Sequence, residues 1–197
     1  MNCYDKSLEP IYKKLGIDIK KCFCTMMNVS WSDQQKKTWE SMFTESGAEP
    51  YESKDKSWIK GLVYENHPHI TLLYWSLDGV TPDMIKTALS GWEPESLTIS
   101  EVSYFDSPDG EPYYCIIAKV DVTENICDAR SRLELLPHIN TFPDYKAHIT
   151  LGYIKKDQKV LSNILGINKK RTSVAPFTAT PDGVVYDNNS WDPVTIL

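Results

Sequence analysis

The sequence lacks any long apolar run. No stretch comes near the roughly 20 consecutive apolar residues that a helix needs to span a bilayer. Near the N-terminus, Asp5, Lys6 and Glu9 interrupt the region where a signal peptide would carry its apolar segment. We therefore expect a cytoplasmic protein that does not enter a membrane.

The chain also lacks an excess of positive charge. It holds 21 lysines and arginines against 27 aspartates and glutamates, which gives a net charge of −6 at pH 7. Proteins that coat long nucleic acids need a basic surface, so this class of function is disfavoured. A small anionic ligand bound by a few local cations remains compatible with this composition.

The cysteines lack the spacing of a zinc site. They stand at Cys3, Cys22, Cys24, Cys115 and Cys127, an odd number without any C-x-x-C pair. The sequence around them shows no His-Asp arrangement that would activate a thiol nucleophile. We interpret all five as reduced thiols, as is usual in the cytoplasm.

The length and the local patterns predict one α+β domain. The 197 residues suffice for a single core, which we place at 22–197 after an N-terminal extension at 1–21. Strands are predicted at 22–31, 58–64, 69–76, 97–105, 113–122, 148–154 and 172–186, helices at 32–46, 81–91, 123–136 and 158–165, and a tail at 187–197. Ser32 and Gln35 form a capping-box pattern, while Gly47 and Gly166 are expected to end helices.

One tetrapeptide occurs twice. The sequence His69-Ile70-Thr71-Leu72 returns as His148-Ile149-Thr150-Leu151, and a tyrosine follows each copy at the same offset. Both copies fall in predicted strands, where alternate side chains point the same way. Each histidine therefore shares a face with its threonine, while the isoleucine and leucine point into the packing on the other face.

Two such strands side by side would suit the cleavage of a phosphodiester without a metal. A neutral imidazole can take a proton from the attacking hydroxyl, and a protonated imidazole can give one to the leaving oxygen. Threonine hydroxyls can donate to the nonbridging phosphate oxygens. A single H-x-T on a strand is more often a packing feature, but two copies with matching flanks favour catalysis by His69, Thr71, His148 and Thr150.

A histidine metal site is the alternative for the same region. His67 stands two residues before His69, and both could join His138 and His148 as ligands. Pro68 separates the first two, and no acidic residue is interleaved at ligand spacing. We therefore expect no metal and no other cofactor.

Aromatic and basic residues near the motifs have two interpretations. Tyr74 and Tyr153 either pack within their strands or lie at the rim of a site. Lys146, Lys155 and Lys156 flank the second motif and are either solvated or available to a phosphate. Packing and solvation are the commoner roles of such residues.

The twin H-x-T pattern, with a hydrophobic residue and then a tyrosine after each copy, resembles the 2H phosphoesterase superfamily. This superfamily includes RNA 2′,3′-cyclic phosphodiesterases, 2′-5′ RNA ligase-like proteins and 2′-5′ oligoadenylate phosphodiesterases. Within it, the chain looks most like the bacteriophage anti-CBASS protein 1 nucleases. That resemblance spans roughly Cys22 to Trp191 and also includes Glu101-Val102 with aromatics close behind.

The resemblance implies a fold, a substrate and several site residues. The fold is a bilobed, LigT-like one, with two pseudo-symmetric halves of antiparallel sheet and outer helices around a central cleft. The substrate is a cyclic di- or trinucleotide signal, cleaved by a monomer in the bacterial cytoplasm to counter CBASS immunity. The family's base-stacking aromatic would fall at Tyr104 or Phe105, and its acidic base contact at Asp182 or Asp187. Two alternatives stay open: a phosphodiesterase for RNA 2′,3′-cyclic phosphates or 2′-5′ oligoadenylate, and a binder that sequesters a nucleotide without catalysis.

Overall fold

The computed structural model describes residues 13–14, 16, 23–54, 61, 68–107, 110–139, 144–170, 175–187 and 193–197. In chain order its elements are β1 (Phe23–Ser30), α2 (Asp33–Ser46), β2 (His69–Ser76), α3 (Pro82–Ala88), β3 (Leu97–Asp106), β4 (Tyr113–Val120), α4 (Glu124–Leu133), β5 (His148–Lys155), α5 (Gln158–Lys170), β6 (Phe177–Asp187) and β7 (Val194–Thr195). This arrangement confirms the α+β class. Apart from Gly61, the strand predicted at 58–64 lies outside the described residues, as does most of the segment 1–21.

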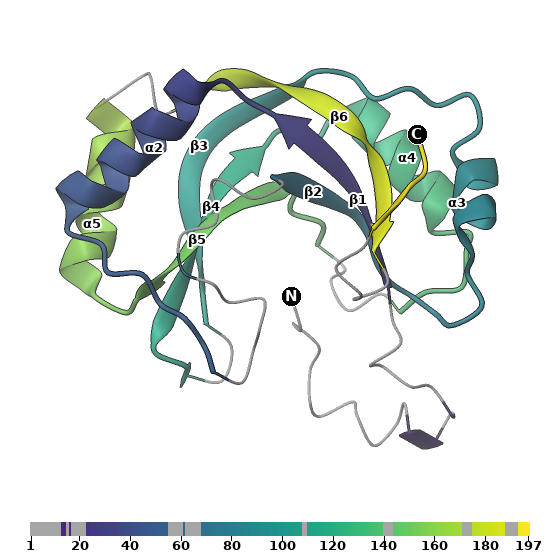
Figure 1. Ribbon diagram of the computed structural model, residues 1–197, viewed down its shortest axis with the longest axis horizontal. Helices are drawn as coiled ribbons and strands as arrows, with labels where there is room; N and C mark the ends of the chain where they lie inside the picture. Colours follow the sequence, from purple (N-terminus) through teal and green to yellow (C-terminus); the bar gives the residue numbers. More distant parts are fainter. Residues whose placement is uncertain are drawn as a thin grey trace.

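The strands form one seven-stranded antiparallel sheet, in the order β2-β1-β6-β3-β4-β5 with β7 against β6. Strand β6 joins two halves, because residues 177–179 pair with β3 while residues 180–187 pair with β1. One half therefore contains β1 and β2, and the other contains β3, β4 and β5. Figure 1 shows the sheet as an arch between two pairs of helices.

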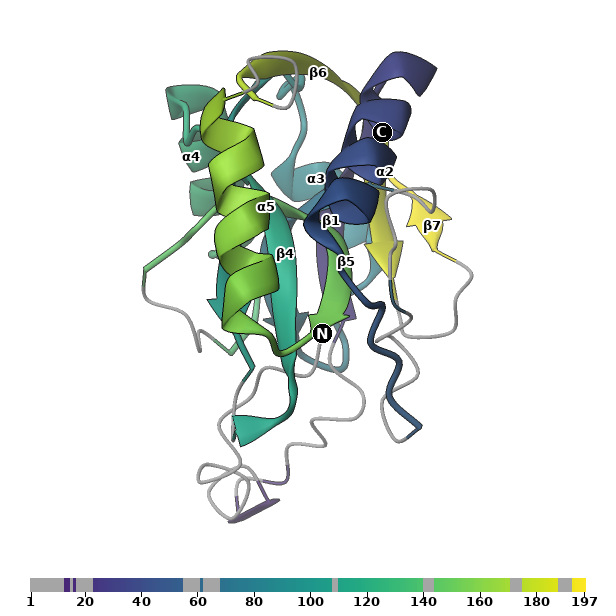
Figure 2. The ribbon, with the colours of Figure 1, turned by 90° about the vertical axis from the view of Figure 1, so that its left-hand side faces the viewer.

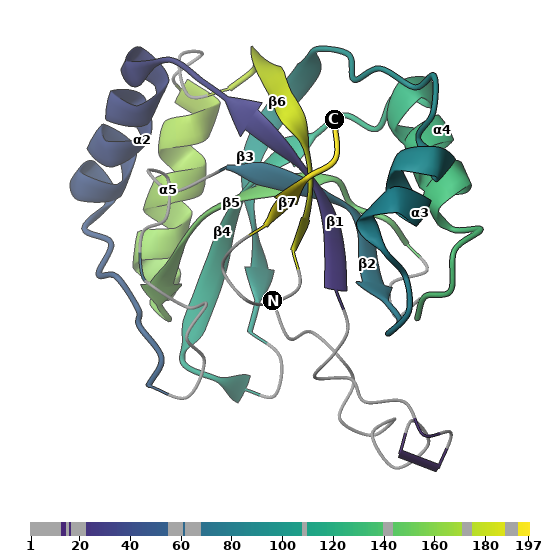
Figure 3. The same ribbon diagram turned by 45° about the vertical axis from the view of Figure 1, so that its right-hand side comes forward.

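The helices cover one face of the sheet. Helices α2 and α5 pack together on one flank (Figure 2), and α3 and α4 lie together on the other (Figure 3). Each of these four helices contributes to one continuous core a side chain whose solvent exposure is at most 1%. These side chains are Trp39, Ile85, Ile126 and Ile164. We call the opposite face, which carries the motif histidines, the site face. No helix in the described part of the chain is long and apolar enough to cross a membrane.

Helix α2 follows its sequence signals closely. Ser32 caps its start, since the hydroxyl accepts from the Gln35 amide at 3.2 Å. Gly47 ends it with a φ of 75°, a left-handed conformation that costs glycine little. The apolar stripe that includes Trp39 and Phe43 is buried. Burial of each large side chain stabilises the folded state by about 1.5–3 kcal/mol.

Helix α5 does not end at Gly166 as predicted but continues to Lys170. A glycine inside a helix costs about 1 kcal/mol. Tertiary contacts offset that cost here, because Ile167 packs against the core and the Asn168 side-chain oxygen accepts from the Val102 amide at 3.3 Å. Packing of the last turn therefore overrides the local stop signal.

The predicted tail is also partly a strand. Residues Val194–Thr195 form β7, and the chain ends against β6 with the Leu197 carbonyl accepting from the Val184 amide at 3.2 Å. Gly183 makes room for this contact, because a Cβ there would lie 2.7 Å from the Leu197 oxygen. The end of the chain is thus part of the sheet.

The segment that leads into β2 lies along the outer edge of β5. In this α2–β2 connection, the Tyr51 amide donates to the Tyr153 carbonyl at 2.8 Å, and the Glu49 carbonyl accepts from the Lys155 amide at 2.9 Å. Strand β5 ends the sheet order, so its outer polar groups would otherwise have no strand partner.

At the other end of the sheet, the segment that leads into β5 lies beside β2. In the α4–β5 connection, the Pro137 carbonyl accepts from the Leu77 amide and the Ile139 amide donates to the Trp75 carbonyl, both at 3.0 Å. Residues 137–139 of this connection therefore border the C-terminal end of β2 on its outer edge. Each motif strand is bordered by the segment that leads into the other one.

Candidate active site

The two motif strands stand at opposite ends of the sheet order, yet they contact each other directly. The hydroxyl of Tyr145, three residues before His148, donates to the Thr71 carbonyl at 2.9 Å. The two imidazoles are also close enough that the charge of His69 lowers the pKa of His148. The curvature of the sheet thus brings the two H-x-T copies together on the site face.

A bulge follows the H-x-T tripeptide in both strands. In β2, Thr71 and Leu73 pair with consecutive residues of β1, and in β5, Thr150 and Gly152 pair with consecutive residues of β4. One leucine is therefore left over in each motif strand. Bulges of this kind bend a strand and change the direction of the side chains that follow. The two halves share this irregularity as well as the tetrapeptide.

The His148 ring has a defined orientation. Its Nδ1 lies 2.7 Å from the Lys146 carbonyl, which can only accept, so Nδ1 carries the proton of the neutral ring and Nε2 is the unprotonated nitrogen. Burial lowers the pKa of His148 below the ordinary value of about 6.5, and the charge of His69 lowers it further, although the Lys146 carbonyl acts in the opposite direction. A neutral imidazole at pH 7 follows from this environment.

The strands next to the motifs give the two histidines different neighbours. His69 pairs across the sheet with Asn28, whereas His148 pairs with Lys119. The Lys119 ammonium lies 2.5 Å from Glu101 on the next strand, and both side chains are about half exposed. Sequence analysis missed Lys119, whose signal was a single charge within the apolar strand β4.

The structure distinguishes between the two aromatic candidates. Tyr104 pairs with the core residue Ile116, and its ring lies against Tyr114, with 5.5 Å between centroids. Tyr104 is therefore on the helix-covered face, so the register favours Phe105 as the aromatic beside the motif histidines. Phe105 lies on the site face, and its ring meets the imidazole of His148 edge to face, with 4.8 Å between centroids.

The recurring tyrosines pack within the sheet. The bulge in β5 turns Tyr153 to the site face, but its ring lies against Tyr113 and is only 6% exposed. Tyr74 is half buried and packs against a small cluster of Trp75 and Ile139. Both positions fit the packing interpretation, and neither ring is presented openly beside the motif histidines.

The flanking lysines also separate into different roles. Lys155 is paired with Glu49 at 2.6 Å and Lys156 with Asp106 at 2.5 Å. Lys146 has an exposed side chain, and its carbonyl orients His148. Of the three, only Lys146 is tied directly to a motif residue.

The acidic candidates lie on β6 beside β1. Asp182 accepts a hydrogen bond from the Ser30 hydroxyl at 3.2 Å. Ser30 stands two residues after Asn28 in β1, so the two side chains share a face of that strand. Asp187 pairs with Cys24, four residues from Asn28 in the other direction. Both acids belong to the half that contains His69, so their register leaves the choice between them open.

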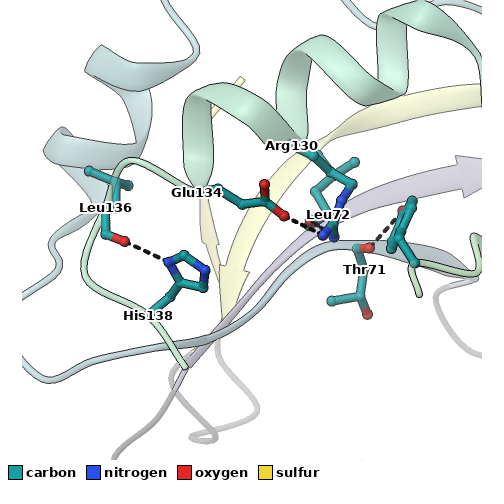
Figure 4. A network of polar contacts seen from close by, with 7 residues as sticks. Thr71, Leu72, Arg130, Glu134, Leu136 and His138 are labelled. Carbon is teal, nitrogen blue, oxygen red and sulfur yellow. Dashed lines mark hydrogen bonds and ion pairs between the residues drawn. The ribbon is translucent and has the colours of Figure 1, made fainter. Parts of the chain in front are cut away.

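In the alternative metal site, His138 lies apart from His69. His138 pairs with Ser76, at the far end of β2 from His69, and its Nδ1 lies 2.8 Å from the Leu136 carbonyl (Figure 4). His67 lies outside the described residues. Within the described ranges, no three His, Cys, Asp or Glu side chains gather as metal ligands.

These features define the class of the fold: the chain has the 2H phosphoesterase fold. Usb1 of Kluyveromyces marxianus is similar in structure, with a TM-score of 0.59 over 91% of this chain and 99% of that chain, at 10% sequence identity. The same Usb1 with uridine monophosphate has a TM-score of 0.57 with equal coverage and identity. No protein-family model and no curated protein matches the sequence. The predicted bilobed fold is thereby confirmed.

Proposed function

We propose that the protein is a metal-independent phosphodiesterase that cleaves 3′-5′ linkages in cyclic oligonucleotides, with His69 and His148 as the acid–base pair. One observation carries the proposal: two H-x-T motifs from opposite ends of the sheet meet on one face. Two imidazoles and two hydroxyls in one place match the needs of a phosphoryl transfer that uses proton transfer alone.

In the proposed reaction, the ribose 2′-hydroxyl attacks the adjacent phosphorus. The bond from O2′ to phosphorus forms, the bond from phosphorus to O5′ breaks, and the products are a 2′,3′-cyclic phosphate and a 5′-hydroxyl. His148 acts as the base, because its lowered pKa keeps Nε2 unprotonated at neutral pH. His69 supplies the proton to O5′, and Thr71 and Thr150 donate to the nonbridging oxygens.

The surroundings of His148 support a nucleotide substrate. Phe105 offers an apolar ring beside the reacting position, and a base stacked on such a ring gains about 1–3 kcal/mol. Lys119 supplies a cation one strand away from His148 within an otherwise acidic protein. The net charge favours a small substrate over long RNA, and hydrolysis of cyclic di- or trinucleotides would silence CBASS signalling during phage infection.

A phosphodiesterase acting on RNA ends is the second candidate. It is supported by the similar fold of Usb1, whose structure has been solved with uridine monophosphate. Both candidates use the same quartet and differ in the substrate that the site accepts.

A substrate panel in the presence of EDTA tests the proposal. The panel contains cyclic dinucleotides, cyclic trinucleotides, 2′-5′ oligoadenylate and RNA ending in a 2′,3′-cyclic phosphate, with products read by mass spectrometry. We expect cleavage of the cyclic 3′-5′ substrates with the chelator present, and no cleavage of their 2′-deoxy analogues. Cleavage of RNA alone would favour the second candidate. Recovery of every ligand intact from a heated complex would overturn the catalytic proposal in favour of a sequestering protein.

A further inference from the structure

We infer that Tyr145 and Arg130 are positioning residues, which together fix the Thr71 strand against the segment that carries His148. This inference rests on the proposed function for its catalytic meaning. Its physical basis is a set of contacts between α4, the α4–β5 connection and β2, none of which involves the reacting groups themselves.

Tyr145 connects the two motifs through one hydrogen bond. Its hydroxyl donates to the Thr71 carbonyl at 2.9 Å, and its backbone lies three residues before His148. The Lys146 carbonyl between them orients the His148 ring. A shift of Thr71 relative to Tyr145 would therefore also be a shift relative to the second imidazole.

Arg130 holds the next carbonyl of the same strand. Its Nη1 donates to the Leu72 carbonyl at 2.9 Å (Figure 4), and the guanidinium lies 3.8 Å over the ring of Tyr145. Glu134, one turn further along α4, pairs with the other guanidinium nitrogen. The Arg130 side chain is only 14% exposed, so the three contacts are shielded from competing water.

The bulge explains why two consecutive carbonyls need these donors. In a regular strand neighbouring carbonyls point to opposite edges, but the extra residue in β2 disrupts this alternation. The carbonyls of Thr71 and Leu72 are both bonded by groups outside the sheet, because β2 is an edge strand. A buried carbonyl without a donor is costly, so Tyr145 and Arg130 make the bulged conformation of the motif strand stable.

The Tyr145 hydroxyl is a dependable donor. Burial raises the pKa of Tyr145 to about 12, against the opposing effect of the Arg130 charge. The phenol thus keeps its proton across the working range of two imidazoles. The contact persists at every pH at which the site can turn over.

Catalysis should depend on this arrangement more than binding does. A misplacement of about 1 Å in a reacting group can cost about 10²-fold in rate. The Tyr145 hydroxyl bonds the backbone carbonyl of Thr71 rather than a motif side chain, so its removal should act on the geometry of Thr71. The expected signature is a loss in kcat with KM nearly constant.

Tyr145→Phe is the test, and Tyr186→Phe is its matched control. The Tyr186 hydroxyl also donates to a backbone carbonyl, that of Val80, at 2.9 Å, but this acceptor belongs to neither motif. We expect Tyr145→Phe to lower kcat about 10- to 100-fold with KM within about threefold. Tyr186→Phe should lose similar thermal stability and keep its kcat. Equal kcat in the two variants would overturn the inference.

A double-mutant cycle identifies the path of the effect. If Tyr145 acts through Thr71, Tyr145→Phe should change kcat less than about threefold in a Thr71→Ala background. The same substitution should retain its full effect in a Thr150→Ala background. An equal loss in both backgrounds would assign Tyr145 to general stability instead.

A spectroscopic measurement keeps the inference testable without turnover. If the wild type cleaves nothing, the proposed function fails, but NMR still reports on the site. The signals of the Thr71 methyl and the His69 ring should shift in Tyr145→Phe and stay in place in Tyr186→Phe. Unchanged signals would contradict the inference. If Tyr145→Phe does not fold, Arg130→Lys removes the planar contact to Leu72 and serves in the same experiment.

Discussion

The ring of Phe105 meets the imidazole of His148 edge to face, at 4.8 Å between centroids and 87° between planes. The two residues come from β3 and β5, so the phenyl ring reaches across β4 to make this contact. The contact removes water from one side of the imidazole, which is consistent with burial as the largest cause of its lowered pKa. An aromatic ring and a motif imidazole thereby share one environment.

Substitution of either motif histidine should abolish most of the activity. Because general acid–base catalysis contributes about 10²–10⁴-fold, we expect His69→Ala or His148→Ala to lose about 3–5 kcal/mol of transition-state stabilisation. The double variant should lose far less than the sum, since the two groups act in one step. Measurement of kcat/KM with thermal melts as a folding check tests this, and near-full turnover in either single variant would contradict it.

The pH dependence should follow from the lowered pKa of His148. As the base, His148 works in its neutral form, whose population increases as pH rises through its pKa. The acid limb of kcat/KM should therefore fall below pH 6.5, and the alkaline limb should report loss of the proton from His69. A pH series of initial rates locates both limbs, and an acid limb above 6.5 would show that His148 is not the base.

Phe105→Leu should weaken substrate binding, whereas Tyr104→Leu should not. Loss of one stacked base corresponds to about 1–3 kcal/mol, or a rise in KM of about 5- to 140-fold. Tyr104 is the adjacent aromatic on the opposite face, so its substitution controls for local effects on β3. Steady-state kinetics on the best panel substrate distinguishes the two. If both variants raise KM equally, the assignment of the site face would be wrong.

Lys119→Met should raise KM through loss of a local positive charge. A charge-assisted contact to a phosphate contributes about 1.5 kcal/mol or more, so a rise of about tenfold is expected. Lys155→Met is the control, since that lysine is ion-paired as Lys119 is but lies at the far end of β5 from His148. Measurement at two salt concentrations adds a second readout, because the Lys119 effect should shrink as salt increases. An equal response of both variants would exclude Lys119 from substrate binding.

The sequence predicts which face the motif residues share better than it predicts the faces of the residues around them. The period of two along a strand, applied within each tripeptide, is enough to put His148 and Thr150 on one face, and the structure has them there. The same rule cannot be carried past the bulges, because an extra residue depends on the register of the partner strand. The faces of Tyr104 and Tyr153 therefore needed the structure.

Contacts to the backbone are the other part that the sequence could not supply. Tyr145 and Arg130 act on carbonyl oxygens, and every residue has a carbonyl, so no residue type indicates where such a bond will form. Gly166 shows the same limit in a helix: its local preference is a stop, but packing of Ile167 decides the outcome. Local signals predicted the structure correctly where the partner of the signalling residue lies in the same helix. Ser32 is an example, because its hydroxyl accepts from the Gln35 amide in the first turn of α2.

The hydrogen bonds by which each connection borders the motif strand of the other half have a consequence for folding and unfolding. Neither half can complete the edge of its own motif strand, since the bordering backbone arrives from the other half. If one connection detached, the motif strand that it borders would lose its backbone partners. The start of the strand into which the connection leads would be exposed as well. We therefore expect the two repeats to assemble and melt together, and a half-length fragment would leave the edge of its motif strand without the backbone partners that the intact chain supplies.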